Sequence, residues 1–486
     1  ASANTVQAVG MPSIQTAASR ADLAKALHEF CEKEHAEHSR TDDWLVTEPL
    51  RNLGKHFAKD IPNAVVVGAK GAGKTFTYLQ ICQSKKWSAY LQRVGEGSPD
   101  VDGMSPRTIF PVLWSSNVEG VAKNAVTNAR ASGLKDLGLG AENLMLSDIE
   151  RRIQTNLESD AVHWDDFWAS LIASALGCPG SGLREINQRL FAASKSVVLV
   201  FDGVEDVFKK PNEPKQIKAI ESLLKLVNRL GELPNQAIGA LVFVRVDYVQ
   251  ATIKQNLGQF LSRFSAFALT WNPESFLRLA YWVCAKANVL NGATVSQAQT
   301  LSVEELIEKL MDLWGQKLGR TDSKEGHSAR WVYAALCDLT GRFQARDLVR
   351  FFGFAAKEEN KNPNDFWADR VLSPESIRKA VPLCSVQKVQ EATLEIEPLK
   401  NWSERMETDH ITERSIPFSA ASVGLQAEEL AVLRELGVIY EDVDPSLGDK
   451  RLFLPEIYRA GLKFDLSGGR PKIQALLKKN LGKMPF

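Results

Sequence analysis

Residues 68–75 read GAKGAGKT, which fits the pattern G-x-x-x-x-G-K-[ST] of a phosphate-binding loop. Before it, NAVVV at residues 63–67 predicts a buried strand, and after it FTYLQIC at residues 76–82 predicts a helix. Glycines let such a loop curl until several backbone N–H groups point at one anion, and the helix adds the positive end of its dipole. Because strand, loop and helix follow in this order, the sequence predicts a nucleotide-binding α/β domain.

The loop provides a continuous set of candidate ligands for a nucleotide. Lys74 is expected to bring its ammonium to the β- and γ-phosphates, and Thr75 to offer its hydroxyl to Mg²⁺. The nucleotide-binding candidates here are Gly68, Ala69, Lys70, Gly71, Ala72, Gly73, Lys74, Thr75 and Phe76. The expected cofactors are ATP and Mg²⁺, although the loop pattern alone fits GTP equally well.

A second signal is an acidic end to a buried strand. Residues 197–206 read VVLVFDGVED, so the first acid appears where the apolar run stops. Nucleotide hydrolysis needs a carboxylate for the metal, which assigns Asp202, and a second group to orient or activate the attacking water. Glu205 and Asp206 both qualify for that second role. We favour Glu205, which falls one turn beyond Asp202, and Asp206 stays open.

Three arginines are candidates for sensing the transferred phosphate. The strand at Ala240–Val244 ends in Arg245, followed by Asp247, and Arg245 would lie beside the γ-phosphate if this strand neighbours the Asp202 strand. Arg342 and Arg346 lie in TGRFQARDLVRFF, where a helix carrying them could swing over the nucleotide. The alternative for each is an ordinary solvated arginine at a strand end or on a helix face.

The chain changes character near residue 269. Strand candidates at 108–114, 197–201 and 238–244 alternate with helical patterns before that point, which favours a parallel sheet in an α/β fold. Two stretches are expected as loops: 94–106, which contains glycines and prolines, and 133–140, which contains three glycines. The expected units are a flexible tail (1–21), an N-terminal helical segment (22–60), the nucleotide-binding core (61–268), a helical lid (269–365), a winged-helix-like domain (366–465) and a basic tail (466–486).

Composition restricts the partners. The 486 residues hold 59 basic and 59 acidic side chains, so a surface that is positive throughout is excluded. The last 21 residues carry five basic and no acidic residues, which leaves a net charge of −5 for the other 465. The apolar runs are strand-length, far below the ~20 residues of a membrane span, and the six cysteines form no CxxC pair. We expect a cytoplasmic protein without membrane contact.

The C-terminal region has a helix-then-hairpin pattern. Ala427–Leu436 predicts a helix, and Val438–Val443 and Arg451–Leu454 predict two strands around a turn. This is the order of a winged helix, which can bind DNA or pack against the ATPase. The basic tail is either a solvated helix or a contact for nucleic-acid phosphates, through Arg470, Lys472, Lys478, Lys479 and Lys483.

The stretches 68–75, 197–206 and 240–247 together resemble the additional-strand branch of P-loop NTPases, which includes AAA+ ATPases and STAND signalling ATPases with NACHT- and KAP-like members. DGVED at 202–206 looks like the DGLDE of the STAND Walker B strand, with the last two acids in the reverse order. Further stretches are similar to a family of bacterial predicted P-loop ATPases: DAVHWDDFWASLIASAL, FVRVDYVQ, ALTWNPESFLRLAYWV, GRFQARDLVRF and LRELGVIYED…RLFLPEIYRAGL. The resemblance covers about residues 40–465.

Two classes of function remain open, besides a nucleotide-binding scaffold that hydrolyses nothing. The resemblance to STAND proteins implies a slow ATPase switch, in which ATP favours a homo-oligomer or a partner protein and ADP a closed monomer, in bacterial stress or antiphage signalling. The alternative is an AAA+-type motor, loader or partitioning factor that contacts DNA through the winged-helix-like domain and the basic tail. DNA-stimulated turnover with a strong salt dependence would indicate the alternative.

Overall fold

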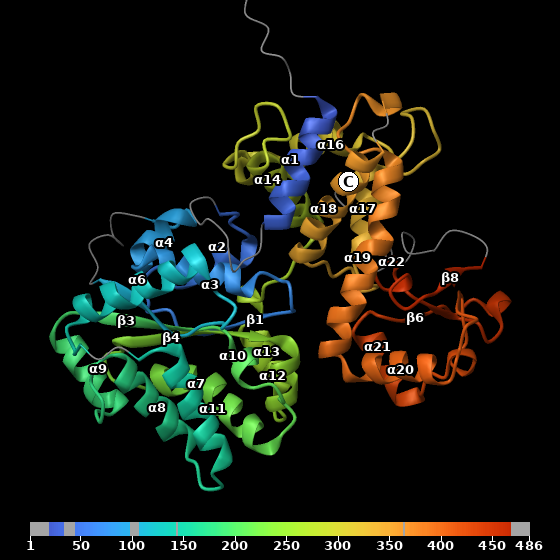
Figure 1. The fold of residues 1–486 in the computed structure, drawn as a ribbon. Helices are drawn as coiled ribbons and strands as arrows, with labels where there is room; N and C mark the ends of the chain where they lie inside the picture. The colour runs from blue at the N-terminus through green and yellow to red at the C-terminus, as the bar shows by residue number, and fades with distance from the viewer. Residues whose placement is uncertain (1–18, 34–43, 98–105, 142–143, 363–364, 468–486) are drawn as a thin grey trace, which may run out of the picture.

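The structure is a computed structural model that describes residues 19–33, 44–97, 106–141, 144–362 and 365–467 (Figure 1). Most of the expected flexible tail and of the basic tail lies outside the described residues. Within the described part of the chain, no helix has the length and apolar character needed to cross a bilayer.

A four-stranded parallel sheet forms the centre of the first half. Its strands are β1 (Ala64–Gly68), β2 (Arg107–Leu113), β3 (Ser196–Phe201) and β4 (Ile238–Arg245), in the order β1-β4-β3-β2. The strands are nearly all buried on both faces, which explains their continuous apolar sequences. β4 is inserted between the loop-bearing strand and the acid-bearing strand, as expected for the additional-strand type. The predicted parallel α/β fold is confirmed.

Helices cover both faces of this sheet (Figure 1). One face carries α2 (Glu48–His56), α3 (Lys74–Ser84), α4 (Trp87–Arg93) and α6 (Gly120–Leu137), and the other carries α7 (Leu146–Glu158), α8 (Trp164–Ala175), α9 (Leu183–Ala192) and α11 (Pro214–Gly231). Shorter helices follow the strands: α10 (Val204–Val207), α12 (Val246–Thr252), α13 (Leu257–Arg263) and the 3₁₀ turn η2 (Ser265–Phe267). Leu269 then makes a parallel bridge to Gly68 and leaves the sheet.

The loop prediction for residues 133–140 is wrong in its first half, because α6 continues to Leu137. A Cβ on Gly133 would lie 2.7 Å from Cδ2 of Phe110, so this glycine allows close packing of helix on sheet. The turn itself is made by Gly138, whose φ of 66° lies in the left-handed region.

The second half is mostly helical. Residues 269–365, expected as the lid, contain α14 (Pro273–Lys286), α15 (Gln297–Thr300), α16 (Val303–Trp314), α17 (Ser328–Leu336) and α18 (Ala345–Lys361). The 3₁₀ turn η3 (Asp365–Trp367) and the long helix α19 (Pro374–Glu395) follow. The C-terminal module, residues 397–465, contains α20 (Glu397–Thr408), β5 (Ser415–Ile416), η4 (Ala421–Val423), α21 (Ala427–Glu435), β6 (Tyr440–Glu441), η5 (Pro445–Leu447), β7 (Leu452–Phe453), α22 (Glu456–Arg459) and β8 (Asp465–Leu466). The helix-then-hairpin order is present, with α21 followed by the antiparallel pair β6 and β7, although these strands are shorter than expected.

Two hydrophobic cores divide the chain. The first includes buried residues from Trp44 to Leu269, and the second includes those from Phe276 to Phe464. The N-terminal segment is split between them, because α1 (Arg20–Lys33) packs in the second core and α2 in the first. His28 Nδ1 lies 3.1 Å from the carbonyl oxygen of Gly353, which fixes α1 against α18. The lid and the C-terminal module therefore share one core, and α1 belongs to it.

Candidate functional site

The phosphate-binding loop joins the carboxyl end of β1 to the start of α3. Gly71 and Gly73 adopt φ values of 80° and 96°, which only glycine adopts without strain, so the backbone requires glycine at both positions, and Gly73 is the second glycine of the motif. Lys74 is buried, and its ammonium donates to the carbonyl oxygens of Gly68 and Ala69 at 3.4 and 3.3 Å. The loop thus holds its own lysine at the point where a phosphate oxygen would take over these bonds.

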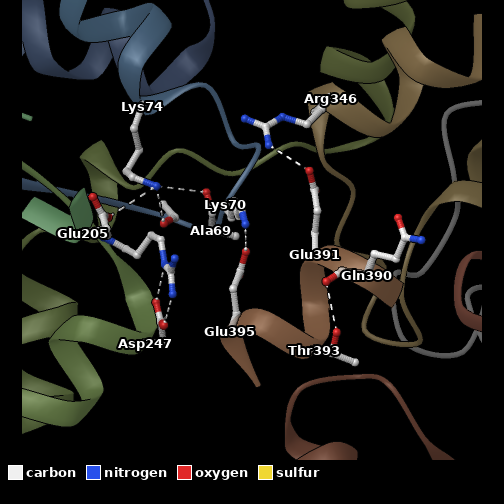
Figure 2. A network of polar contacts seen from close by, with 12 residues as sticks. Ala69, Lys70, Lys74, Glu205, Asp247, Arg346, Gln390, Glu391, Thr393 and Glu395 are labelled. Atoms are coloured by element: carbon white, nitrogen blue, oxygen red, sulfur yellow. Dashed lines mark hydrogen bonds and ion pairs between the residues drawn. The ribbon is translucent and has the colours of Figure 1, made fainter. Parts of the chain in front are cut away.

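Glu205 meets the loop from the neighbouring strands. It lies in α10, directly after β3, and its Oε1 is 3.8 Å from the Lys74 ammonium. The same oxygen accepts a hydrogen bond of 2.7 Å from the backbone N–H of Arg245 at the end of β4. β4 lies between β1 and β3. The Glu205 carboxylate, which follows β3, therefore contacts both the end of β4 and the lysine of the loop that follows β1 (Figure 2).

Asp202 is buried beneath the loop. Burial raises its pKa to about 7, and the nearby Glu205 charge adds to that rise, while Lys74 and a hydrogen bond with Thr75 oppose it. Its second oxygen, Oδ2, is buried and has no hydrogen-bond partner among the described residues. A buried carboxylate oxygen left over beside a threonine hydroxyl suits a hard cation, so Asp202 and Thr75 fit a Mg²⁺ ion.

Asp206, the other candidate base, faces a different neighbour. Its Oδ2 accepts hydrogen bonds from the Ser115 hydroxyl at 2.6 Å and from the Ser116 N–H at 3.1 Å, just beyond the end of β2. The structure therefore brings Glu205 to the loop and places Asp206 one strand away.

Of the three arginines, Arg346 makes the closest approach to the loop. The backbone N–H of Arg346 donates to the carbonyl oxygen of Gly71 at 3.4 Å, and a Cβ on that glycine would lie 3.2 Å from the Arg346 Cβ. Arg245 reaches the site with its backbone, while its guanidinium pairs with Asp247, with Nε 2.9 Å from Oδ1. Arg342 is exposed just after a turn, and its backbone N–H donates to the Asp338 carboxylate. The structure does not bring Arg342 to the phosphate-binding loop.

A cavity of about 330 Å³ lies beside the loop and under the lid. The segment before α2 contributes part of its wall, and α14 and α18 contribute another. The lining residues include Leu45, Thr47, Leu50, Gly71, Phe76, Trp271, Leu279, Trp282, Arg346 and Arg350. Trp271 also donates its indole N–H to the Ala72 carbonyl oxygen at 3.0 Å, which ties the start of the lid to the loop. The size and apolar walls suit a flat aromatic base.

Two carboxylates of α19 reach the same region, and sequence analysis missed both (Figure 2). Glu395 Oε1 lies 3.4 Å from the ammonium of Lys70 in the loop. Burial raises the pKa of Glu395, and the charges of Arg245 and Lys70 oppose that rise. Glu391 accepts a hydrogen bond of 3.2 Å from Arg346 and others from Arg350. No local motif marks either residue, since the contacts join segments more than 40 residues apart.

Comparisons with known proteins give little. No protein-family model and no curated protein matches the chain. Two solved structures of the Aeropyrum pernix ORC2 protein, in ADPNP-ADP complexes and in the ADP form, are similar at 13% and 14% identity. The alignments cover 93% and 94% of this chain and 99% of those chains, with TM-scores of 0.31 and 0.34. Similarity at this level assigns neither a family nor a function, and the fold is read from the sheet order and the loop.

Gly203 positions the helix that carries Glu205, and alanine there should destabilise the core. Its φ is 75°, and a Cβ would lie 2.7 Å from the backbone N and Cα of Ser115. We expect Gly203→Ala to lower the free energy of unfolding by about 2 kcal/mol or more, because strained backbone and a backbone clash add. Thermal unfolding followed by calorimetry measures this. Gly258→Ala is the matched control, since nothing lies within 4 Å of a Cβ there, and equal melting temperatures for the two variants would contradict the expectation.

Proposed function

We propose that the chain is a Mg²⁺-dependent ATPase. The observation that carries the proposal is the convergence of Lys74, Asp202 and Glu205 at one end of the parallel sheet, beside an apolar cavity. A phosphate-binding loop, a buried acid and a second acid are the three parts that nucleotide hydrolysis requires. The lid covers the cavity, so its opening and closure would depend on whether a nucleotide is bound there.

Each residue then has a defined task. The N–H groups of the loop and the Lys74 ammonium bind the β- and γ-phosphates, and the positive end of α3 favours the same charge. Asp202 and Thr75 would hold Mg²⁺, which neutralises phosphate charge when it is bound. Glu205 accepts a hydrogen bond from the attacking water and orients it, since its carboxylate already faces the loop. Arg346 lines the cavity from the lid side, where its guanidinium would add positive charge once it leaves Glu391.

The cavity favours adenine over guanine. Guanine presents an N–H and an NH₂ group on one edge, and proteins usually meet these with a carboxylate. Among the described residues, the polar side chains that line the cavity are threonines and arginines, without a carboxylate or a side-chain amide. We therefore propose ATP as the nucleotide, with weaker binding of GTP.

The C-terminal module has the charge of a protein-binding domain. Residues 397–465 hold 14 acidic and 8 basic residues, a net charge of −6. On α21, the exposed charges are Glu428, Glu435 and Arg434, so the helix in the recognition position has no excess of positive charge. Phosphate contacts on DNA depend on such an excess. This favours a switch in which the module contacts the ATPase or a partner protein.

A DNA-acting ATPase is the second candidate, and the basic tail after residue 466 is the feature that supports it. One experiment separates the two: phosphate release from Mg·ATP and the mass of the particle, measured together with and without duplex DNA. The switch predicts slow turnover that DNA leaves unchanged and a new assembly state with an ATP analogue, as the STAND resemblance implies. Turnover that rises with DNA and falls steeply with salt would favour the second candidate, and absence of any ATP binding would remove both.

A further inference from the structure

Helix α19 connects the lid to the C-terminal module and ends at the nucleotide site. It is 22 residues long, packs along α18, and also contacts α20 and α22 (Figure 1). Its last turns point toward the loop between β1 and α3 (Figure 2). No other segment of the described chain joins the module to the loop by ion pairs in this way.

The contacts at this end are carboxylates on cations. Glu395 pairs with Lys70 at 3.4 Å, and Glu391 pairs with Arg346 at 3.2 Å. Lys70 belongs to the loop, and Arg346 touches Gly71 of the loop through its backbone. Both carboxylates are mostly buried, with side-chain exposures of 17% and 22%. Lys70 is therefore paired with a carboxylate from the second core, whereas Arg346, which lies on α18, is paired within that core.

Behind these pairs, α19 is fixed to its own side of the molecule. Lys388 donates to Asp347 on α18 at 2.8 Å, and both side chains are buried. Ser385 accepts a hydrogen bond of 2.8 Å from the N–H of Gly461, just after α22. These bonds hold α18, α19 and α22 together, so a change at Glu395 would move these helices and the module as one body.

A bound triphosphate would oppose this arrangement. It adds several negative charges next to two carboxylates and offers Lys70 and Arg346 better partners. A ligand that binds only one of two arrangements shifts the equilibrium toward that arrangement, and the arrangement in turn changes the ligand's affinity by the same factor.

We propose that Glu395 is a carboxylate latch that holds α19, and with it the C-terminal module, against the loop, while Glu391 keeps the Arg346 charge paired on the lid side. Nucleotide phosphates release the latch by taking Lys70 and Arg346. This inference rests on the proposed ATP site and names its regulation. The module's position then reports whether a triphosphate is bound, without any contact between the module and the base.

The test compares the full chain with the double variant Glu391→Gln/Glu395→Gln, which keeps the shape and removes both charges. Glu397→Gln is the matched control, since Glu397 is the next glutamate along and is exposed. The dissociation constant for Mg·ATP is measured by tryptophan fluorescence, to which Trp271 and Trp282 in the cavity wall contribute. The radius of gyration without nucleotide is measured by X-ray scattering.

We expect the double variant to bind Mg·ATP about tenfold more tightly than the control, within the usual range of coupling between sites. Without nucleotide, its radius of gyration should match that of the wild-type chain with Mg·ATP. Equal affinities and equal radii for the double variant and the control would overturn the latch. If the double variant does not fold, Lys70→Gln breaks the Glu395 pair from the other side, and an unchanged radius in that variant would equally overturn it. Wild-type protein that binds no ATP at all would overturn the proposed function itself, which separates the two failures.

Discussion

Replacing Lys74 with alanine is expected to weaken Mg·ATP binding about 100-fold or more and to abolish phosphate release. The Lys74 ammonium is buried and held 3.3–3.4 Å from two loop carbonyls, so it is positioned before the ligand arrives. Alanine removes the point charge that faces the phosphates and leaves Glu205 beside an anionic ligand. Titration with Mg·ATP, followed by tryptophan fluorescence, measures the loss.

Lys55→Ala is the control for this variant, because Lys55 is an exposed lysine of α2 in the same domain. It should bind and hydrolyse ATP as the wild type does. Lys74→Ala protein that melts like the wild type and still binds Mg·ATP with the same affinity would show that residues 68–75 are not a nucleotide site.

Replacing Glu205 with glutamine should separate binding from chemistry. The amide keeps the size of the side chain and can still accept the Arg245 N–H, but it is a poor acceptor for the proton of a water. We expect ATP affinity to change less than about threefold and turnover to fall about 100-fold or more, as is usual when a catalytic base is removed. Binding titrations and single-turnover phosphate release measure the two effects separately.

Asp206→Asn is the comparison that decides between the two acids. Asp206 accepts hydrogen bonds from Ser115 and Ser116, so the asparagine variant should lose stability near the end of β2. Its turnover should fall less than about tenfold. The reverse result, with turnover lost in Asp206→Asn and kept in Glu205→Gln, would transfer the role of base to Asp206.

The local parts of the site could be predicted because each lies within a short stretch of chain. The loop, its lysine and the acid at the end of β3 follow from spacing and from strand and helix patterns alone. The prediction for Arg245 depends on β4 lying next to the strand that carries Asp202. The sheet order has β4 next to β3, which places the backbone of Arg245 beside Glu205. Between Arg342 and Arg346 the sequence could not choose, since the choice depends on where α18 begins.

The parts that were missed depend on contacts between distant segments. Glu395 meets Lys70 across more than 300 residues, and nothing near either residue predicts the pairing. The cavity wall at Leu45 and Trp271 comes from segments with no phosphate-binding signal of their own. The sequence predicts a loop at Gly133, which lies inside α6, because a glycine needed for close packing cannot be distinguished in sequence from a glycine needed for a turn. The division of residues 22–60 between two cores has the same origin, as only tertiary packing assigns α1 to the lid.

The most direct test of the central claim is phosphate release from ATP by the full chain, measured with Mg²⁺ and again with excess EDTA. An ATPase built on Lys74, Asp202 and Glu205 should release phosphate slowly but measurably with Mg²⁺ and lose this activity in EDTA. A chain that releases no phosphate with Mg²⁺ above the Lys74→Ala background would contradict the account.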